Sequence, residues 1–254
     1  RNFLLDRLES AVQPGMGGPG PALLLGEPAD ERLQRPRIVA DPLPAEDPHR
    51  EPVRRQYAHL RAVRQGTRAS SPTRGYLDVG MDLRALLLAN GFGMPTTEVV
   101  LADADVRWPT GADALIRHLP AASWTHVGSS SVPGLDAKPI LDLLGVVPSP
   151  TAVAGLQAPL EALGFQWLGE YGISGRGFAR LRADLDYAHL HVFPAGHPHV
   201  QAMLRFRDRL RSDPVALDRY RSLKVHLSRT LSADRDAYTN AKAALILELM
   251  TSEP

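Results

Sequence analysis

The clearest pattern in the chain is an apolar run interrupted by small polar residues, HVGSSSVPGLDAKPILDLLGV, at residues 126–146. The apolar residues on either side of the serines predict two buried β-strands, over 123–129 and 138–147. The serines and the glycines between the strands predict a turn. Asp142 lies inside the second apolar run, where an unpaired carboxylate is costly to bury. The pattern therefore raises the question of what that carboxylate binds.

The remaining pattern predicts a mixed α/β (α+β) domain with a helical C-terminal third. Helices are predicted over 80–90, 110–120, 151–164, 198–211, 214–230 and 233–250. Further strands are predicted over 96–103 and 165–171, with a hairpin around 184–186. Thr110 and Thr151 are the expected N-caps of two helices, and Asp213-Pro214 and Ser232 are the expected start signals of the last two.

Residues 1–75 differ from the rest of the chain. They hold 10 of the 22 prolines and a Gly/Pro-rich stretch, QPGMGGPGPALLLGEP. Such spacing opposes helices and central strands, and we expect a mostly disordered or loosely docked extension with one short helix at about 50–65. We therefore expect three parts: the extension at 1–75, a helix and connector at 76–98, and a globular domain at 99–251.

The composition excludes some classes of site. The 254 residues include no cysteine, which excludes disulfides and thiolate metal sites. No apolar run reaches the roughly 18–20 residues that span a bilayer, and a net charge of +1 indicates neither nucleic acid nor a membrane surface as partner. A cytoplasmic location is expected. The 29 basic residues include only three lysines: Lys138, Lys224 and Lys242.

The serine-rich turn is the first candidate site. Gly128, Ser129 and Ser131 follow a strand, where glycine allows close approach and N–H and hydroxyl groups suit phosphate oxygens. Asp142 on the next strand suits Mg²⁺, which prefers a carboxylate together with phosphate oxygens. The alternative is structural: the serines cap a turn, and Asp142 accepts hydrogen bonds from a neighbouring loop.

A histidine pair is the second candidate. His189 and His191 are two residues apart, so on a strand they share a face and could bind a metal together. The alternative is that they hydrogen-bond substrate phosphate or neighbouring chain. His197 and His199 match no motif, and we expect structural roles for them.

Basic residues form the third candidate set. They could converge on the serine turn as an anion pocket for phosphate, and the alternative for any one of them is a surface ion pair. The set contains Lys138, Arg176, Arg207, Arg211, Tyr220 and Lys224. Asp184 and Asp186 have metal-ligand spacing, but their position favours a turn.

Residues 126–146 resemble the signature of the GrpB family, H-I-G-S-T-S-V-P-G-L-x-A-K-P-I-[IV]-D-[IL]. Further segments resemble family motifs in the same order. These are VLADADVRWP at 100–109, GISGRGF at 172–178, HLHV at 189–192, FRDRLR at 206–211, YRSLK at 220–224, and Tyr238 with Lys242. The resemblance covers about residues 99–251 and leaves 1–98 unmatched.

The resemblance implies a fold of the nucleotidyltransferase type. In that superfamily a strand ends in Gly-Ser, here Gly128-Ser129, and the next strand carries Asp-x-Asp, whose carboxylates hold Mg²⁺ against a nucleoside triphosphate. Asp142 matches the first carboxylate, but Leu144 stands at the second. The resemblance places His189 and His191 near a third carboxylate position. With Asp142 they would form a 2-His-1-carboxylate set, which favours Mn, Fe or Zn over Mg.

Two functional hypotheses follow from the resemblance. The first is a metal-dependent nucleotidyltransferase that binds or acts on a nucleotide or another phosphorylated small molecule, with a divalent cation (Mg, Mn or Zn). The second is a ligand-binding or accessory module, without catalysis, that supports a partner enzyme. Leu144 favours the second, and the set of basic residues and histidines favours a working ligand site.

Overall fold

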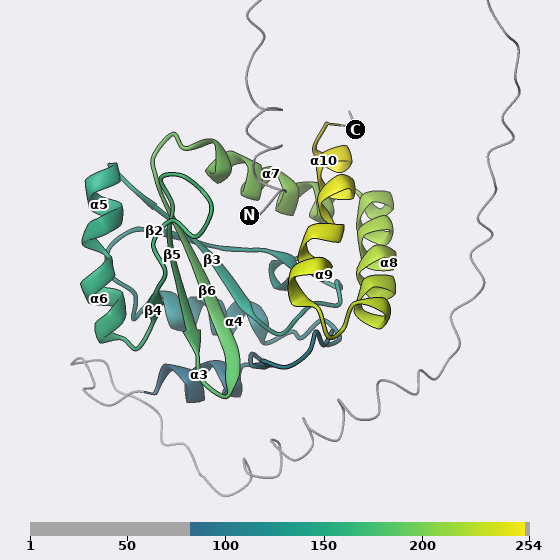
Figure 1. Ribbon diagram of the computed structural model, residues 1–254, viewed down its shortest axis with the longest axis horizontal. Helices are drawn as coiled ribbons and strands as arrows, with labels where there is room; N and C mark the ends of the chain where they lie inside the picture. Colours follow the sequence, from purple (N-terminus) through teal and green to yellow (C-terminus); the bar gives the residue numbers. More distant parts are fainter. Residues whose placement is uncertain (1–81, 252–254) are drawn as a thin grey trace, which may run out of the picture. The chain divides into compact units, whose positions relative to one another are not determined.

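The computed structural model describes residues 82–251, and a mixed β-sheet lies at its centre (Figure 1). The strands are β1 (Met94–Pro95), β2 (Ser123–Val127), β3 (Leu141–Val147), β4 (Gln166–Trp167), β5 (Gly177–Arg182) and β6 (Leu185–Pro194). Their order is β2-β3-β6-β5-β4, and β1 pairs with β6. The β3–β6 pair is parallel, and the other pairs are antiparallel.

Helices flank this sheet. They are α3 (Leu83–Ala89), α4 (Trp108–Ile116), the short 3₁₀ helix η2 (Ser129–Ser131), α5 (Pro150–Gly155), α6 (Gln157–Ala162), α7 (Pro198–Ser212), α8 (Pro214–Thr230), α9 (Arg235–Ala241) and α10 (Ala243–Thr251). Helix α4 contacts β2 and β3, α5 contacts β3 and β6, and α7 contacts β2 and packs with α8 and α10. In Figure 1, α5 and α6 lie at one side of the sheet and α8–α10 at the other. The predicted mixed α/β fold with a helical C-terminal third is confirmed.

The alternation along β3 separates two environments. Leu141 and Leu143 are fully buried in the main apolar core, which also contains residues of α3–α6. Leu144 belongs to a second cluster, with Phe193 and Val200. Because alternate strand residues share a face, Asp142 lies on the Leu144 side of the sheet and not in the main core. This explains how a carboxylate fits within an apolar run.

Most of the predicted elements are present. The strands β2 and β3 lie within the predicted segments, the β5–β6 hairpin is formed, and helices α3, α7 and α8 match their predicted ranges to within about three residues. Asp213 caps α8 as expected and accepts from Val215 N–H and Ala216 N–H. The predicted helix at 50–65 lies outside the described residues.

Several predicted elements differ from the structure. Residues 96–103 form no strand beyond an isolated Ala102–Ala137 bridge, because this segment binds the helical part, with Val99 N–H donating to Ser232 C=O. The helix predicted from Thr110 begins at Trp108, since Pro109 fits its first turn.

The predicted helix at 151–164 is instead two helices, because Pro159 lacks the N–H that would continue the hydrogen-bond ladder. Its N-cap is Ser149, whose hydroxyl accepts from Ala152 N–H. The last predicted helix is divided at Lys242 and is capped by Asp234, not Ser232. The helices within 82–251 include none that is both long and apolar enough to cross a membrane.

Candidate functional site

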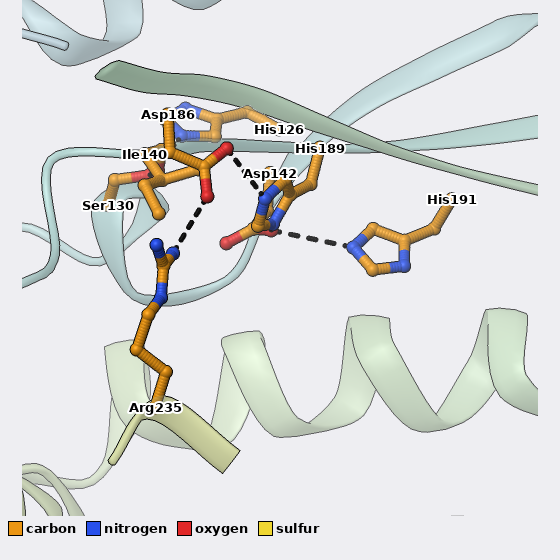
Figure 2. A network of polar contacts seen from close by, with 8 residues as sticks. All are labelled: His126, Ser130, Ile140, Asp142, Asp186, His189, His191 and Arg235. Carbon is orange, nitrogen blue, oxygen red and sulfur yellow. Dashed lines mark hydrogen bonds and ion pairs between the residues drawn. The ribbon is translucent and has the colours of Figure 1, made fainter. Parts of the chain in front are cut away.

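The parallel pairing of β3 and β6 brings Asp142 together with both predicted histidines (Figure 2). Asp142 lies opposite His189 in the register, and His191 lies opposite Leu144. The His189 Nδ1 atom is 3.5 Å from Asp142 Oδ1, and the His191 Nε2 atom is 3.4 Å from the same oxygen. Two imidazoles therefore converge on one carboxylate oxygen.

Asp186 extends this network. Its Oδ1 atom is 3.1 Å from His189 Nε2, and its Oδ2 atom accepts from Arg235 Nη2 at 2.7 Å. Asp186 is buried in β6, so the expectation that it lies in the hairpin turn is wrong. The turn consists of the two residues before β6, and Asp184 there accepts from the Tyr187 hydroxyl. The ion pair with Arg235 explains how a carboxylate is tolerated inside the strand.

The network separates the proton affinities of the two histidines. Burial alone would lower the pKa of His189, but its hydrogen bonds to Asp142 and Asp186 outweigh burial and raise that pKa. For His191, burial outweighs the single hydrogen bond to Asp142, and its pKa is lowered. Burial opposes ionisation of Asp142, yet the two histidines hold its pKa well below its usual range. The site thus favours the ionised form of Asp142, and it favours protonation of His189 over protonation of His191.

Gly128 allows the serine turn to approach Asp142 closely. Its φ is +70°, and a methyl group on its Cα would lie 2.6 Å from Asp142 Oδ2. Any side chain at this position would be strained and would collide with the carboxylate. Gly128 therefore lies directly beside Asp142, and its contact with phosphate stays a prediction.

The serine hydroxyls have different partners. Ser131 Oγ donates to Gly128 C=O at 2.7 Å, inside the turn. Ser130 Oγ donates to Ile140 C=O and lies 3.0 Å from His126 Nε2 (Figure 2). Ser129 instead forms a side-chain hydrogen bond with the Tyr220 phenol. This bond lowers the pKa of Tyr220, but burial outweighs it and raises that pKa to about 12. Of the three serines, Ser129 is the one turned toward a predicted binding residue.

All three lysines of the chain interact electrostatically with the Asp142 carboxylate. Asp142 interacts electrostatically with Lys138, which precedes β3, with Lys224 of α8, and with Lys242 between α9 and α10. Lys224 is fully buried and donates to Asp136 C=O at 2.5 Å. Burial lowers the pKa of each lysine, Lys138 lowers that of Lys242 further, and both of them lower that of Lys224. An anion beside these lysines would raise their pKa values again and favour their protonated forms.

The predicted arginines bind backbone carbonyls. Arg207 donates to His126 C=O at 3.1 Å and joins α7 to β2, and Arg211 donates to Ser131 C=O at 2.6 Å and joins α7 to the serine turn. Arg176 donates to Glu170 C=O at 3.0 Å and lies over the Phe178 ring. These contacts hold the three arginine side chains in place. Direct contact of these arginines with phosphate stays a prediction.

With this geometry established, the chain can be compared with known proteins. The GrpB protein family model matches residues 98–252. The chain belongs to the GrpB family. The resemblance found in the sequence is thereby confirmed, and the residues before 98 are unmatched.

Relatives of this GrpB domain are found in several bacteria. UPF0157 protein PA4798 of Pseudomonas aeruginosa is 35% identical over 157 residues, which cover 58% of this chain and 64% of that protein. UPF0157 protein SCO7215 of Streptomyces coelicolor is 33% identical over 165 residues, 62% of this chain and 85% of that protein. This chain spans 30% of the length of another relative, UPF0157 protein YqkA of Bacillus subtilis.

A solved structure shares the fold of this GrpB domain. The crystal structure of conserved protein GrpB from Enterococcus faecalis has a TM-score of 0.53 and 29% identity, covering 59% of this chain and 94% of that one. A weak similarity to the Cid1 poly (U) polymerase bound to MgGTP, with a TM-score of 0.29 and 16% identity over 47% of this chain and 43% of that one, carries no information on function.

The predicted metal set of the GrpB domain does not form a preformed centre. A cation bound at about 2.0–2.2 Å by nitrogen and oxygen ligands suits the Asp142–histidine distances, and Asp186 would orient His189. However, residues 82–251 contain no group of three or more His, Asp or Glu side chains arranged to hold a metal ion. The lysines around Asp142 also repel a cation. The divalent cation stays a prediction.

Four residues beside the site were missing from the predicted set: Asp186, Arg235, Tyr238 and Lys242. Tyr238 and Lys242 carried two signals, since they match a family motif and Lys242 is one of only three lysines. The spacing of Asp184 and Asp186 marks Asp186 as a candidate, although its position in the sequence favours a turn. Nothing in the sequence distinguishes Arg235 from the other arginines.

Proposed function

We propose that this GrpB domain binds a phosphate-bearing small molecule at Asp142, with nucleotides as the first candidates. The observation that supports this is the convergence of Lys138, Lys224 and Lys242 on one carboxylate. Burial disfavours the charged form of these lysines, and a bound phosphate group would stabilise that form with charge-assisted hydrogen bonds.

Solvent exposure supports binding at this site. The side chains of Asp142, His189 and His191 are 29%, 21% and 17% exposed. The exposed parts of these three side chains give a ligand access to the carboxylate and both rings.

The separation of the histidine pKa values favours a second function, nucleotidyl or phosphoryl transfer. Two titratable groups whose pKa values are pushed apart can act as acid and base. His189 would then give a proton to the leaving oxygen, and His191 would accept one from the attacking group. The alternative, a ligand-binding or accessory module without catalysis, is supported by Leu144, which supplies no second carboxylate.

Thermal unfolding with a nucleotide panel tests the binding proposal. AMP, ADP, ATP, GTP and UTP are each compared with adenosine, with EDTA or with Mg²⁺, Mn²⁺ or Zn²⁺. A nucleotide at 100 times its dissociation constant should stabilise the domain by about 2.7 kcal/mol, and adenosine should not. The Lys138→Met variant should lose this stabilisation, and Arg205→Met, at an exposed position on α7, should retain it. Equal stabilisation by adenosine and ATP, or none by any nucleotide, would refute the proposal.

Turnover separates transfer from binding alone. Release of pyrophosphate or phosphate from each triphosphate is followed by ³¹P NMR for the wild type, His189→Ala and His191→Ala. Transfer predicts that both variants bind nucleotide but lose turnover by about 100-fold or more. Wild-type binding without turnover under any cation condition would support the accessory module.

A further inference from the structure

Tyr238 lies beside two of the three lysines. Its ring centroid is 4.5 Å from Lys242 Nζ, one helical turn further along the chain, and 5.5 Å from Lys138 Nζ. Tyr220 of α8 has the same relation to Lys224, at 5.5 Å, and it also interacts with Tyr238. The side of the site formed by the C-terminal helices is thus an alternation of phenol rings and ammonium groups.

Several polar groups here lack partners. The Tyr238 hydroxyl is fully buried and has no hydrogen-bond partner in the described part of the chain. Within residues 82–251, the half-buried ammonium groups of Lys138 and Lys242 contact the Tyr238 ring and have no side-chain hydrogen bond or ion pair. The buried Tyr238 hydroxyl without a partner costs about 1–3 kcal/mol, and a ligand that accepts its hydrogen bond would remove this cost. All three are donors, so the ligand they require is an acceptor.

We propose that Tyr238 and Lys242 form a second anionic subsite beside Asp142, which takes a second phosphoryl group of the ligand. The inference rests on the proposed function and narrows it. It specifies a ligand with two or more adjacent phosphoryl groups, such as a nucleoside diphosphate or triphosphate, rather than a monophosphate.

The charges around Lys242 link its protonation to the binding of an anion. Lys138, from the loop before β3, repels it, Asp142 of β3 attracts it, and the Lys224 ammonium of α8 lies in the same cluster. Burial, followed by repulsion from Lys138, lowers the pKa of Lys242 to about 7. A bound polyanion offsets both effects and raises this pKa. Filling the subsite should therefore draw a proton from solution onto the lysine cluster.

Calorimetry of AMP and ADP binding tests this subsite. Titrations at pH 8 with EDTA, in buffers of different ionisation enthalpy, measure the protons taken up per ligand bound. The phosphate groups of both nucleotides are already ionised at this pH, so they contribute little. We expect uptake of about one proton with ADP, clearly less with AMP, and ADP affinity at least tenfold above that of AMP.

Variants locate the effect. Lys242→Met keeps the length of the side chain without its charge, and should bring ADP affinity down to that of AMP while leaving AMP binding nearly unchanged. Tyr238→Phe removes only the unpaired hydroxyl, so it should fold as the wild type does and weaken ADP binding several-fold. Arg205→Met is the matched control and should change neither nucleotide.

The outcomes separate this inference from the proposed function. ADP binding to the wild type without proton uptake overturns the subsite and leaves the proposed function intact. Equal losses of AMP and ADP binding in Lys242→Met would place Lys242 at the first phosphate and overturn the subsite as well. If neither AMP nor ADP binds the wild type, both proposals fail.

Discussion

Arg235 and Asp186 form an ion pair of 2.7 Å across 49 residues of sequence. The pair joins the start of α9 to β6, and it leaves the carboxylate side chain only 3% exposed. The other oxygen of Asp186 binds His189. One buried carboxylate therefore connects the helix that carries Tyr238 to the strand that carries the site histidines.

Loss of Arg235 should destabilise the domain. Arg235→Met leaves Asp186 buried without its arginine partner, which we expect to lower the free energy of unfolding by about 2–4 kcal/mol. Urea unfolding at pH 7 measures the change. Arg205→Met, which removes an exposed arginine, should change it by less than about 0.5 kcal/mol. Equal effects of the two variants would contradict the role assigned to the ion pair.

Loss of the Asp186 charge should change the titration of His189. The pKa of His189 is raised, so its contribution to stability is present below pH 6.5 and is lost as the pH rises through the raised value. His189 and Arg235 outweigh the effect of burial and lower the pKa of Asp186 to about 2, so its contribution is present above pH 4 and is lost as the pH falls toward 2.

Asp186→Asn should therefore lower the pKa of His189, as followed by NMR of the imidazole nitrogens. In the wild type, His189 should titrate at a higher pH than His191. A His189 pKa that is unchanged in Asp186→Asn would show that Asp142 alone controls the ring.

His199 should limit acid stability. Its ring is 3% exposed, stacks on Phe193, and has no hydrogen-bond partner among the described residues. Burial lowers its pKa to about 4, so the unfolded chain binds the proton first and stability falls as the pH drops from 6.5 toward 4.

His199→Phe should raise the free energy of unfolding by about 1–2 kcal/mol at pH 7, and by more at pH 5, in urea titrations. The control variant His226→Phe, at an exposed position, should not raise the free energy of unfolding at pH 7. A His199→Phe protein with wild-type acid sensitivity would count against this explanation.

Gly128 and Gly134 offer a matched pair. Both have positive φ, +70° and +73°, but only Gly128 would place a Cβ against Asp142, whereas Gly134 has nothing within 4 Å. Gly134→Ala should cost about 1 kcal/mol of backbone strain. Gly128→Ala should cost about 2 kcal/mol more and should weaken nucleotide binding, as measured by urea unfolding and calorimetry. Equal costs would mean that the contact with Asp142 imposes no constraint.

The sequence identifies the strand side of the site better than the helical side. Asp142, the serine turn and the histidine pair lie on short motifs whose alternation can be read directly. The register that sets His189 opposite Asp142 depends on parallel pairing between strands far apart in the chain, and local pattern does not specify it. Asp186 was misassigned because the ion pair that stabilises it is formed by a distant arginine.

Helix boundaries and the lysine cluster show the same limit. Pro159 marks the α5–α6 break in the sequence, but residues 96–103 look like a strand until their partners in the helical part are known. In the sequence, Lys242 is marked by its rarity and by its match to a family motif, but not by any link to Asp142. Its place beside Tyr238 and Asp142 results from the packing of α8–α10, which tertiary structure determines.

The central claim, that Asp142 sits inside a phosphate-binding cluster of cations, is tested most directly by the affinity of Asp142→Asn for ADP. The measurement is made by calorimetry at pH 7 with EDTA, against the wild type. Because the carboxylate is a negative charge facing the bound phosphates, its neutralisation should tighten ADP binding by about 3–10-fold. Weakened or abolished ADP binding in Asp142→Asn would contradict the claim, because it would mean that the carboxylate itself holds the ligand.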